Sequence, residues 1–219
     1  MNIISFGDIH EDTQNLNKLA DELKTADIIL ISGDLTNYHG KASAETVINS
    51  IRKHNNNILA QPGNLDQSEV DDYLSSEKIN LHGNGYIFKN VGIFGVGGSN
   101  QTPFNTPTEY SEDEIKEFLY SGYKKIETCE IKIMVPHMPP KNTNVDKVAS
   151  GMHVGSESVR DFIEEYKPDI CICGHIHEAR GKDFIGNTRI LNAGMFGDGG
   201  YIEIICGDKD LKAELKMIN

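Results

Sequence analysis

The chain has 219 residues, a length that suits one α/β domain or two small ones. Its formal net charge is −12, from 21 basic and 33 acidic residues. Such a balance disfavours nonspecific binding of DNA or RNA, which depends on lysine and arginine. No apolar run approaches the ~20 residues that a membrane helix needs. We therefore expect neither a membrane nor a nucleic acid as partner.

In the first half of the chain, short apolar runs alternate with segments whose apolar residues have helical spacing. Three runs have the length and apolar character of buried strands: residues 3–6, 28–31 and 58–60. Asp12 or Thr13 can cap a first helix, and residues 42–53 predict a second. Their apolar positions are Leu16, Leu19, Ala20, Leu23, Ala44, Val47, Ile48 and Ile51. This alternation predicts a parallel sheet with right-handed crossovers.

The second half mixes two kinds of strand pattern with two further helices. Short strands and glycine turns over residues 79–96 predict antiparallel pairing. A capping box at residues 111–114 and the Gly155-Ser156 pair each predict the start of a helix. Two more buried strands are expected at residues 131–135 and 170–173, and the tail over residues 179–217 is typical of a β-meander.

Two long polar loops interrupt this pattern, at residues 97–103 and 136–155. Loops of this length inside a compact domain usually serve a function, although a tolerated surface insertion is the alternative. The four cysteines are Cys129, Cys171, Cys173 and Cys206. A single C-x-C is weak evidence for zinc, so we interpret them as reduced, buried thiols. With no signal peptide at the N-terminus, they predict a cytoplasmic protein.

Residues of metal-binding type stand directly after five of the apolar runs. The fragments are Gly7-Asp8-Ile9-His10, Gly33-Asp34, Gly63-Asn64, Pro136-His137 and Gly174-His175-Ile176-His177. In an α/β sheet, ligands bind outside the carboxyl ends of the strands. We therefore expect two carboxylates, one amide and four imidazoles to meet in one cleft.

This set of side chains predicts a binuclear metal centre. Carboxylates with imidazoles suit Mn, Fe, Zn, Ni or Co, whereas Mg and Ca sites use more oxygen. Asp8 and His10 alternate along an extended chain, so both can face one ion only if the chain bends after the strand. Any one fragment alone is better explained by a structural histidine. The five together indicate two divalent transition metal ions, with Mn²⁺ the first choice.

The ordered set resembles the calcineurin-like metallophosphoesterase superfamily, over residues 3 to about 194. Its closest similarity is to the small prokaryotic phosphodiesterase-type members, carried by His137-Met138-Pro139-Pro140, His153-Val154-Gly155-Ser156 and Asn192-Ala193-Gly194. The resemblance implies an α/β (α+β) fold, a four-layer α-β-β-α sandwich of the metallo-dependent phosphatase type. We expect one domain of this kind over residues 1–219.

The resemblance also implies a division of labour among the ligands. Asp8, His10 and His177 would hold one ion. Asn64, His137 and His175 would hold the second, and Asp34 would bridge the two ions. Asn64 is also expected to contact the substrate. A metal-bound hydroxide would then attack the phosphorus of a small phosphoester in line.

One position departs from the family pattern. The common motif Gly-Asn-His-Asp/Glu reads Gly63-Asn64-Leu65-Asp66 here. The family's histidine is assigned to stabilising the transition state or to protonating the leaving group, and a general acid contributes about 10²- to 10⁴-fold. Leucine cannot do so, which favours phosphodiesters with good leaving groups over monoesters. His153 in the second long loop is a candidate substitute for this acid, and a loop-packing histidine is the alternative.

Two rival functions follow from the same motifs. A noncatalytic scaffold of the same fold would be expected to lose metal ligands, and all seven are present. A nuclease would need a basic surface, which the acidic balance disfavours. The sequence therefore predicts a cytoplasmic, metal-dependent phosphoesterase, and leaves the oligomeric state open.

Overall fold

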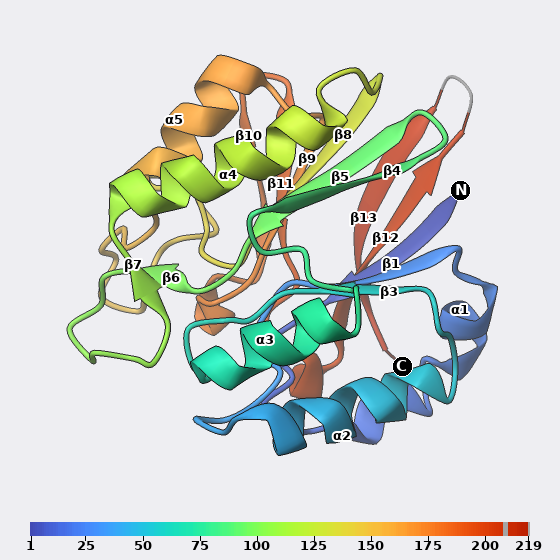
Figure 1. The fold of residues 1–219 in the computed structure, drawn as a ribbon. Coiled ribbons are helices and arrows are strands. Elements are labelled where there is room, and N and C mark those ends of the chain that lie inside the picture. The colour runs from blue at the N-terminus through green and yellow to red at the C-terminus, as the bar shows by residue number, and fades with distance from the viewer. Residues whose placement is uncertain (208–209, 219) are drawn as a thin grey trace.

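In the computed structural model, which describes residues 1–207 and 210–218, two β-sheets lie face to face between two layers of helices (Figure 1). The five-stranded sheet has the order β13 (Leu211–Met217), β12 (Gly200–Cys206), β1 (Asn2–Phe6), β2 (Ile28–Ile31), β3 (Ile58–Ala60). Strands β1, β2 and β3 are parallel, as the alternating pattern predicts. Strands β12 and β13 add an antiparallel hairpin on the β1 side.

The six-stranded sheet contains most of the remaining strands. Its order is β10 (Gly181–Ile185), β11 (Thr188–Asn192), β9 (Ile170–Cys173), β8 (Ile131–Pro136), β5 (Val91–Val96), β4 (Asn84–Phe88). The four central strands are parallel, and the outer strands β10 and β4 are antiparallel to their neighbours. A two-stranded piece, β6 (Ser99–Asn100) with β7 (Glu109–Tyr110), lies outside both sheets.

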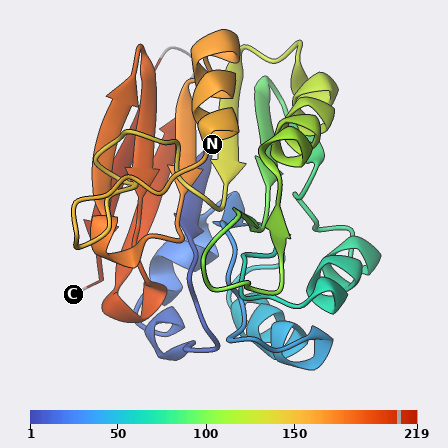
Figure 2. The same cartoon turned by 90° about the vertical axis from the view of Figure 1, so that its left-hand side faces the viewer.

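Helices cover the outer face of each sheet, on opposite sides of the molecule (Figure 2). The five-stranded sheet carries α1 (Ala20–Thr25), α2 (Lys41–Arg52) and α3 (Ser68–Ser76). The six-stranded sheet carries α4 (Glu112–Ile126) and α5 (Glu157–Tyr166). Ser111 and Glu114 form the predicted capping box of α4, and Ser156 caps α5. The result is the four-layer α-β-β-α sandwich that the family resemblance implies.

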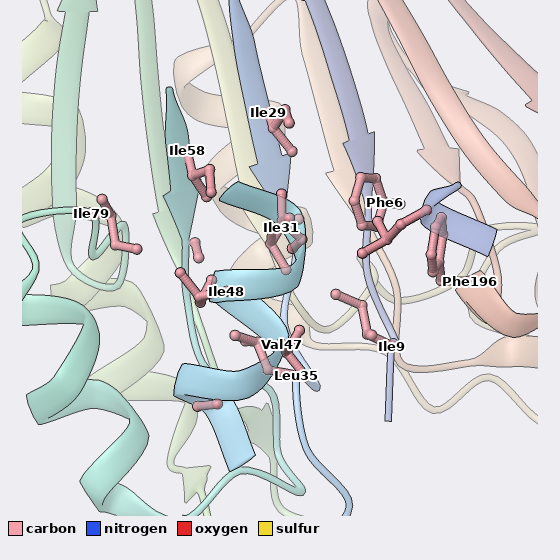
Figure 3. Close-up of a cluster of buried hydrophobic side chains, with 14 of the residues drawn as sticks. Phe6, Ile9, Ile29, Ile31, Leu35, Val47, Ile48, Ile58, Ile79 and Phe196 are labelled. Atoms are coloured by element: carbon pink, nitrogen blue, oxygen red, sulfur yellow. The ribbon is translucent and has the colours of Figure 1, made fainter. Parts of the chain in front are cut away.

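Three apolar clusters hold these layers together, one at each interface. Side chains alternate along a strand, so one set faces the helices and the other faces the opposite sheet. On β2, Ile29 and Ile31 pack toward α2, where Val47 and Ile48 meet them (Figure 3). Leu30 between them joins the cluster that fills the space between the sheets. None of the helices in the described part of the chain is long and apolar enough to span a membrane.

The helix expected from Asp12 or Thr13 is divided in two. A 3₁₀ turn covers Gln14–Leu16, and α1 begins only at Ala20. Thr13 makes no capping bond, whereas the Asn15 amide donates to the carbonyls of Phe196 and Gly197 at 3.0 and 2.9 Å. These tertiary hydrogen bonds hold the segment out of a continuous helix.

Two further elements differ from the sequence-based expectation. Helix α3 was not predicted, because Val70, Tyr73 and Leu74 are its only buried residues. The tail is not a single meander but two hairpins in different sheets, β10–β11 and β12–β13. A 3₁₀ turn at Phe196–Asp198 lies between them, and Phe196 stacks on Phe6 with ring centroids 4.3 Å apart.

Candidate metal centre

The seven predicted ligands lie where the carboxyl ends of strands from both sheets meet. Asp8 and His10 follow β1, Asp34 follows β2, and Asn64 follows β3. In the other sheet, His137 follows β8, and His175 and His177 follow β9. Gln61, fully buried, joins the two edges, because its amide donates to the carbonyls of Ser32, Val96 and Val135 at 3.3, 3.1 and 2.8 Å.

Close backbone approach explains two glycines that precede ligands. A Cβ on Gly63 would lie 2.0 Å from Asp34 Oδ1, which is impossible without moving the carboxylate. A Cβ on Gly33 would lie 2.4 Å from His137 Nδ1, and its φ of +122° is unfavourable for any other residue. The ligands can therefore approach one another only because these positions have no side chain.

The bend required after β1 is present in the backbone. Asp8, His10, Asp34 and His175 have φ values of 49°, 47°, 49° and 68°, all in the left-handed region. Residues other than glycine adopt this region rarely, and such strain collects at functional sites. The sequence-based expectation of a bend between Asp8 and His10 is thus met by strained backbone rather than by glycine alone.

Asp8, His10 and His177 form one group of donor atoms. Their donor atoms lie within 4.8 Å of one another. His177 Nε2 is 3.2 Å from Asp8 Oδ1 and 3.3 Å from His10 Nε2. The buried Asp8 carboxylate also accepts the His175 backbone N–H at 3.1 Å. This group can hold a cation.

A second group surrounds Asp34. Asp8, Asp34 and His137, all buried, also have donor atoms within 4.8 Å of one another. Asp34 Oδ2 lies 3.5 Å from His137 Nε2 and 3.9 Å from His10 Nε2, so this carboxylate stands between histidines of both predicted sets. Its other oxygen accepts the Leu65 N–H at 2.9 Å, which fixes the carboxylate in place.

Asn64 and His175 adjoin this second group. Asn64 Oδ1 is 2.8 Å from His175 Nδ1 and 3.2 Å from His137 Nε2. The amide is oriented by Thr106, whose Oγ1 accepts its N–H at 3.1 Å. Because Thr106 Oγ1 donates in turn to Glu109 at 2.6 Å, the Asn64 oxygen faces the imidazoles.

The electrostatics of these groups favour a cation. Burial raises the pKa of Asp34, but the charges of His137 and His10 outweigh it and lower the pKa to about 2. Burial lowers the pKa of His137, but the charges of Asp34 and Asp8 raise it to about 9. Burial, with the charge of His137, lowers the pKa of His175 to about 4. A divalent cation competes with protons for such atoms, so the donor set fits metal ions.

Asp66 holds two ligand loops together, a role that the sequence analysis did not assign. Its carboxylate accepts N–H bonds from Leu35, Thr36 and Gly63 at 3.0, 2.7 and 2.8 Å, and the Thr36 hydroxyl at 2.7 Å. Burial and the charge of Asp34 raise the pKa of Asp66 to about 7. The sequence signal that could have identified Asp66 is its position two residues after the predicted ligand Asn64.

His153 lines a pocket of about 920 Å³ that reaches the candidate metal centre. Asn64, His175 and His153 are all among the residues that line it. His153 Nδ1 is 2.6 Å from Asp146 Oδ1, and Asp146 is fully buried. The Asp146 carboxylate also accepts the N–H groups of Thr143 and Gly155, so it fixes this loop and the ring of His153.

Comparisons with known proteins agree with this architecture. The family model for calcineurin-like phosphoesterases matches residues 1–179. An uncharacterized protein of Methanocaldococcus jannaschii is 39% identical over 199 residues, 88% of this chain and 87% of that protein. A crystal structure from Thermus thermophilus is 18% identical, with a TM-score of 0.71 over 100% of this chain and 99% of that one.

A more distant structure shares the fold alone. The purple acid phosphatase PPD1 from yellow lupin is 14% identical, with a TM-score of 0.63 over 99% of this chain and 51% of its own. The donor atoms of Asp8, His10, Asp34, His137 and His177 form a possible metal site, which is typical of the matched family. On the family model, the chain belongs to the calcineurin-like phosphoesterase family.

Proposed function

We propose that this protein is a metal-dependent phosphodiesterase that hydrolyses small phosphodiesters. The observation that supports a diester is Leu65, which stands next to Asn64 and has no proton to give to a leaving group. A leaving group with a low pKa needs little protonation, so activated diesters would depend least on how well His153 replaces the family's acid. Monoesters with alkyl leaving groups need that proton most.

The family resemblance implies how the predicted ligands would divide between two ions. Asp8, His10 and His177 would hold one ion, Asn64, His137 and His175 the other, and Asp34 would contact both. Imidazoles with carboxylates suit Mn²⁺ first, with Fe, Zn, Ni or Co as alternatives. When bound, the two ions would supply the nucleophile and neutralise charge on the phosphoryl oxygens.

The protein's own side chains would contribute positioning and a proton. Asn64, which lines the pocket, is proposed to contact a phosphoryl oxygen. His153 is proposed to protonate the leaving oxygen from Nε2, because Asp146 engages Nδ1. The buried Asp146 carboxylate would keep the imidazole in that orientation.

The deciding experiment is hydrolysis of a panel of esters by metal-stripped protein to which Mn²⁺ is returned. The panel contains bis-nitrophenyl phosphate, nitrophenyl phosphate, an alkyl phosphate and cyclic nucleotides. We expect the activated diester to be cleaved fastest and the alkyl monoester slowest. Faster turnover of the alkyl monoester would show that the substitution at Leu65 does not set the substrate class.

The same panel addresses the rival functions. Two bound metals with no turnover of any ester would favour a scaffold. Cleavage of duplex DNA would favour a nuclease, against the acidic charge of the chain. The cytoplasmic location stays a proposal, supported by four free, buried cysteines.

A further inference from the structure

The pocket beside the candidate metal centre has an apolar mouth that the proposed hydrolysis does not itself require. Phe104 and Met152 both line this pocket, and their exposed fractions are 79% and 63%. They come from two different loops, while Asn64 and His175 belong to the same pocket. The apolar mouth therefore continues directly into the candidate metal centre.

Phe104 sits on a braced loop despite its exposure. Thr102 Oγ1 accepts the Phe104 N–H at 3.1 Å, and the same hydroxyl donates to Glu109 at 2.6 Å. Glu109 also accepts the Thr106 hydroxyl, which orients Asn64. One carboxylate thus braces the backbone that carries Phe104 and, through Thr106, orients the amide of Asn64 from a different loop.

Met152 is presented in a comparable way from the loop after β8. The Val148 N–H donates to the Met152 carbonyl at 3.0 Å, and the Gly151 N–H donates to the Val148 carbonyl at 2.7 Å. The next residue is His153, which Asp146 holds. Met152 is therefore the neighbour in sequence of the proposed acid. Its flexible thioether side chain can pack against an aromatic ring.

The charges of the pocket indicate what its occupant is not. Among the described residues that line it, Lys141 is the one lysine or arginine, and it is paired with Glu157. Glu112 accepts the Ser156 hydroxyl at 2.6 Å, and Glu178 accepts the Ala149 N–H at 3.3 Å. These carboxylates would repel a second anionic group, so the arm that fills the pocket carries no negative charge.

We propose that the pocket binds one arm of the phosphodiester through a flat, uncharged aromatic ring, with Phe104 as the stacking surface and Met152 as a second apolar contact. This proposal rests on the proposed function for the place of the phosphoryl group. A nucleobase and a simple aryl group share this chemistry. An aromatic side chain can stack on any base or aryl ring, because each of them has a π-face.

Calorimetry with Mn²⁺-loaded protein tests this through binding rather than through hydrolysis. The probes are the monomethyl esters of benzylphosphonate and cyclohexylmethylphosphonate, which share charge and similar size but differ in flatness. We expect the benzyl ester to bind about 5- to 100-fold more tightly. Phe104→Ala should abolish this preference and Phe104→Tyr should keep it. Phe184→Ala, on β10 with 55% exposure and outside the pocket, is the matched control and should change nothing.

Thymidine 5′-methylphosphonate distinguishes the two sources of the ring. Tighter binding than the benzyl ester assigns a nucleoside arm, and weaker binding assigns an aryl arm. Equal affinity for the benzyl and cyclohexylmethyl esters, or a preference that survives Phe104→Ala, overturns the proposal. Hydrolysis of bis-nitrophenyl phosphate is measured in parallel. Turnover without ring preference defeats the pocket proposal alone, and ring preference without turnover defeats the catalytic proposal alone.

Discussion

Asp34 is the residue predicted to bridge the two ions, whereas the two groups of donor atoms share Asp8. Asp34 Oδ2 faces His137 at 3.5 Å and His10 at 3.9 Å, and these histidines belong to different predicted ion sites. The Leu65 N–H holds the other oxygen, so the carboxylate has one free oxygen to share. The family resemblance already implies this bridging place for Asp34, and the fold adds the distances to both histidines.

Removal of this carboxylate should therefore affect metal binding before anything else. We expect Asp34→Ala to lose at least one ion and all measurable ester hydrolysis. Elemental analysis of the purified variant gives the metal content per chain. Asp21→Ala, at an exposed position of α1, is the control and should keep both ions. Two metals per chain in Asp34→Ala would contradict the assigned role.

His153 makes a separate prediction, because it lies in the pocket rather than among the ligands. We expect His153→Ala to lower kcat about 10- to 10³-fold for poor leaving groups, and less for nitrophenol. Both metals should stay bound. His54→Ala, just after the end of α2, serves as the control. Equal rates for variant and wild type across leaving groups would leave His153 a packing residue.

At the scale of elements, the centre depends on loops that one buried carboxylate joins. Asp66 connects the loop after β2, through Leu35 and Thr36, with the loop after β3, through Gly63. These loops carry Asp34 and Asn64. The distance between the two loops is thus set by hydrogen bonds between residues about 30 positions apart in the sequence. No local sequence pattern reveals such bonds.

Truncation of this side chain should destabilise the whole protein. Asp66→Ala leaves buried N–H groups without acceptors, and each unsatisfied donor costs about 1–3 kcal/mol. We expect a loss of roughly 3–5 kcal/mol in the free energy of unfolding, measured by urea denaturation. Asp72→Ala, exposed on α3, should change it by less than about 0.5 kcal/mol. A comparable small change in Asp66→Ala would refute the bracing role.

The loop that carries Phe104 should respond to pH through Glu109. Burial raises the pKa of Glu109, but hydrogen bonds from Thr102 and Thr106 outweigh it and lower the pKa to about 2. A depressed pKa stabilises the folded state above the ordinary value of 4.5, and that stabilisation is lost as the pH falls toward 2.

The comparison with Glu109→Gln isolates this effect. Wild type should be more stable than the variant at neutral pH, and the two unfolding free energies should converge as the pH falls from about 4.5 to about 2. Urea denaturation at a series of pH values gives both curves. A difference that stays constant over this range would mean that the Glu109 charge does not stabilise the loop.

At the scale of the whole molecule, the two ends of the chain meet in one sheet. Strand β1 pairs with β12, which the chain reaches only after it has completed the six-stranded sheet. The cluster between the sheets includes Ile3 and Leu30 from one sheet, with Ile133 and Ile172 from the other. A single domain over residues 1–219 remains our prediction, and this interleaving supports it.

One cooperative thermal transition is therefore expected in calorimetry, with metal ions bound. Metals bind the folded state, so chelation should lower Tm. At a free ion concentration 100 times Kd, the stabilisation is about 2.7 kcal/mol per ion. Metal-stripped Asp34→Ala should show a smaller rise in Tm when Mn²⁺ is returned. Two resolved transitions would point to two independently folding units.

Local patterns were sufficient for much of this protein. Strands β1, β2, β3, β8 and β9, helices α2, α4 and α5, and the seven candidate ligands follow from apolar spacing, capping residues and polar side chains at strand ends. These signals are local in the chain, because strand and helix periodicity repeats within a few residues. The family resemblance rests on the same fragments, and the family model confirms it.

Other features depend on residues distant in sequence, so only the tertiary structure could decide them. Helix α3 exists because three apolar residues find a core to pack against. The Asn64 amide faces the histidines because Thr106 orients it from 42 residues away. The pocket is formed where Phe104 and His153 come together from separate loops. Long-range packing and hydrogen bonds act between segments that a local sequence pattern treats as independent. A local pattern therefore cannot predict these features.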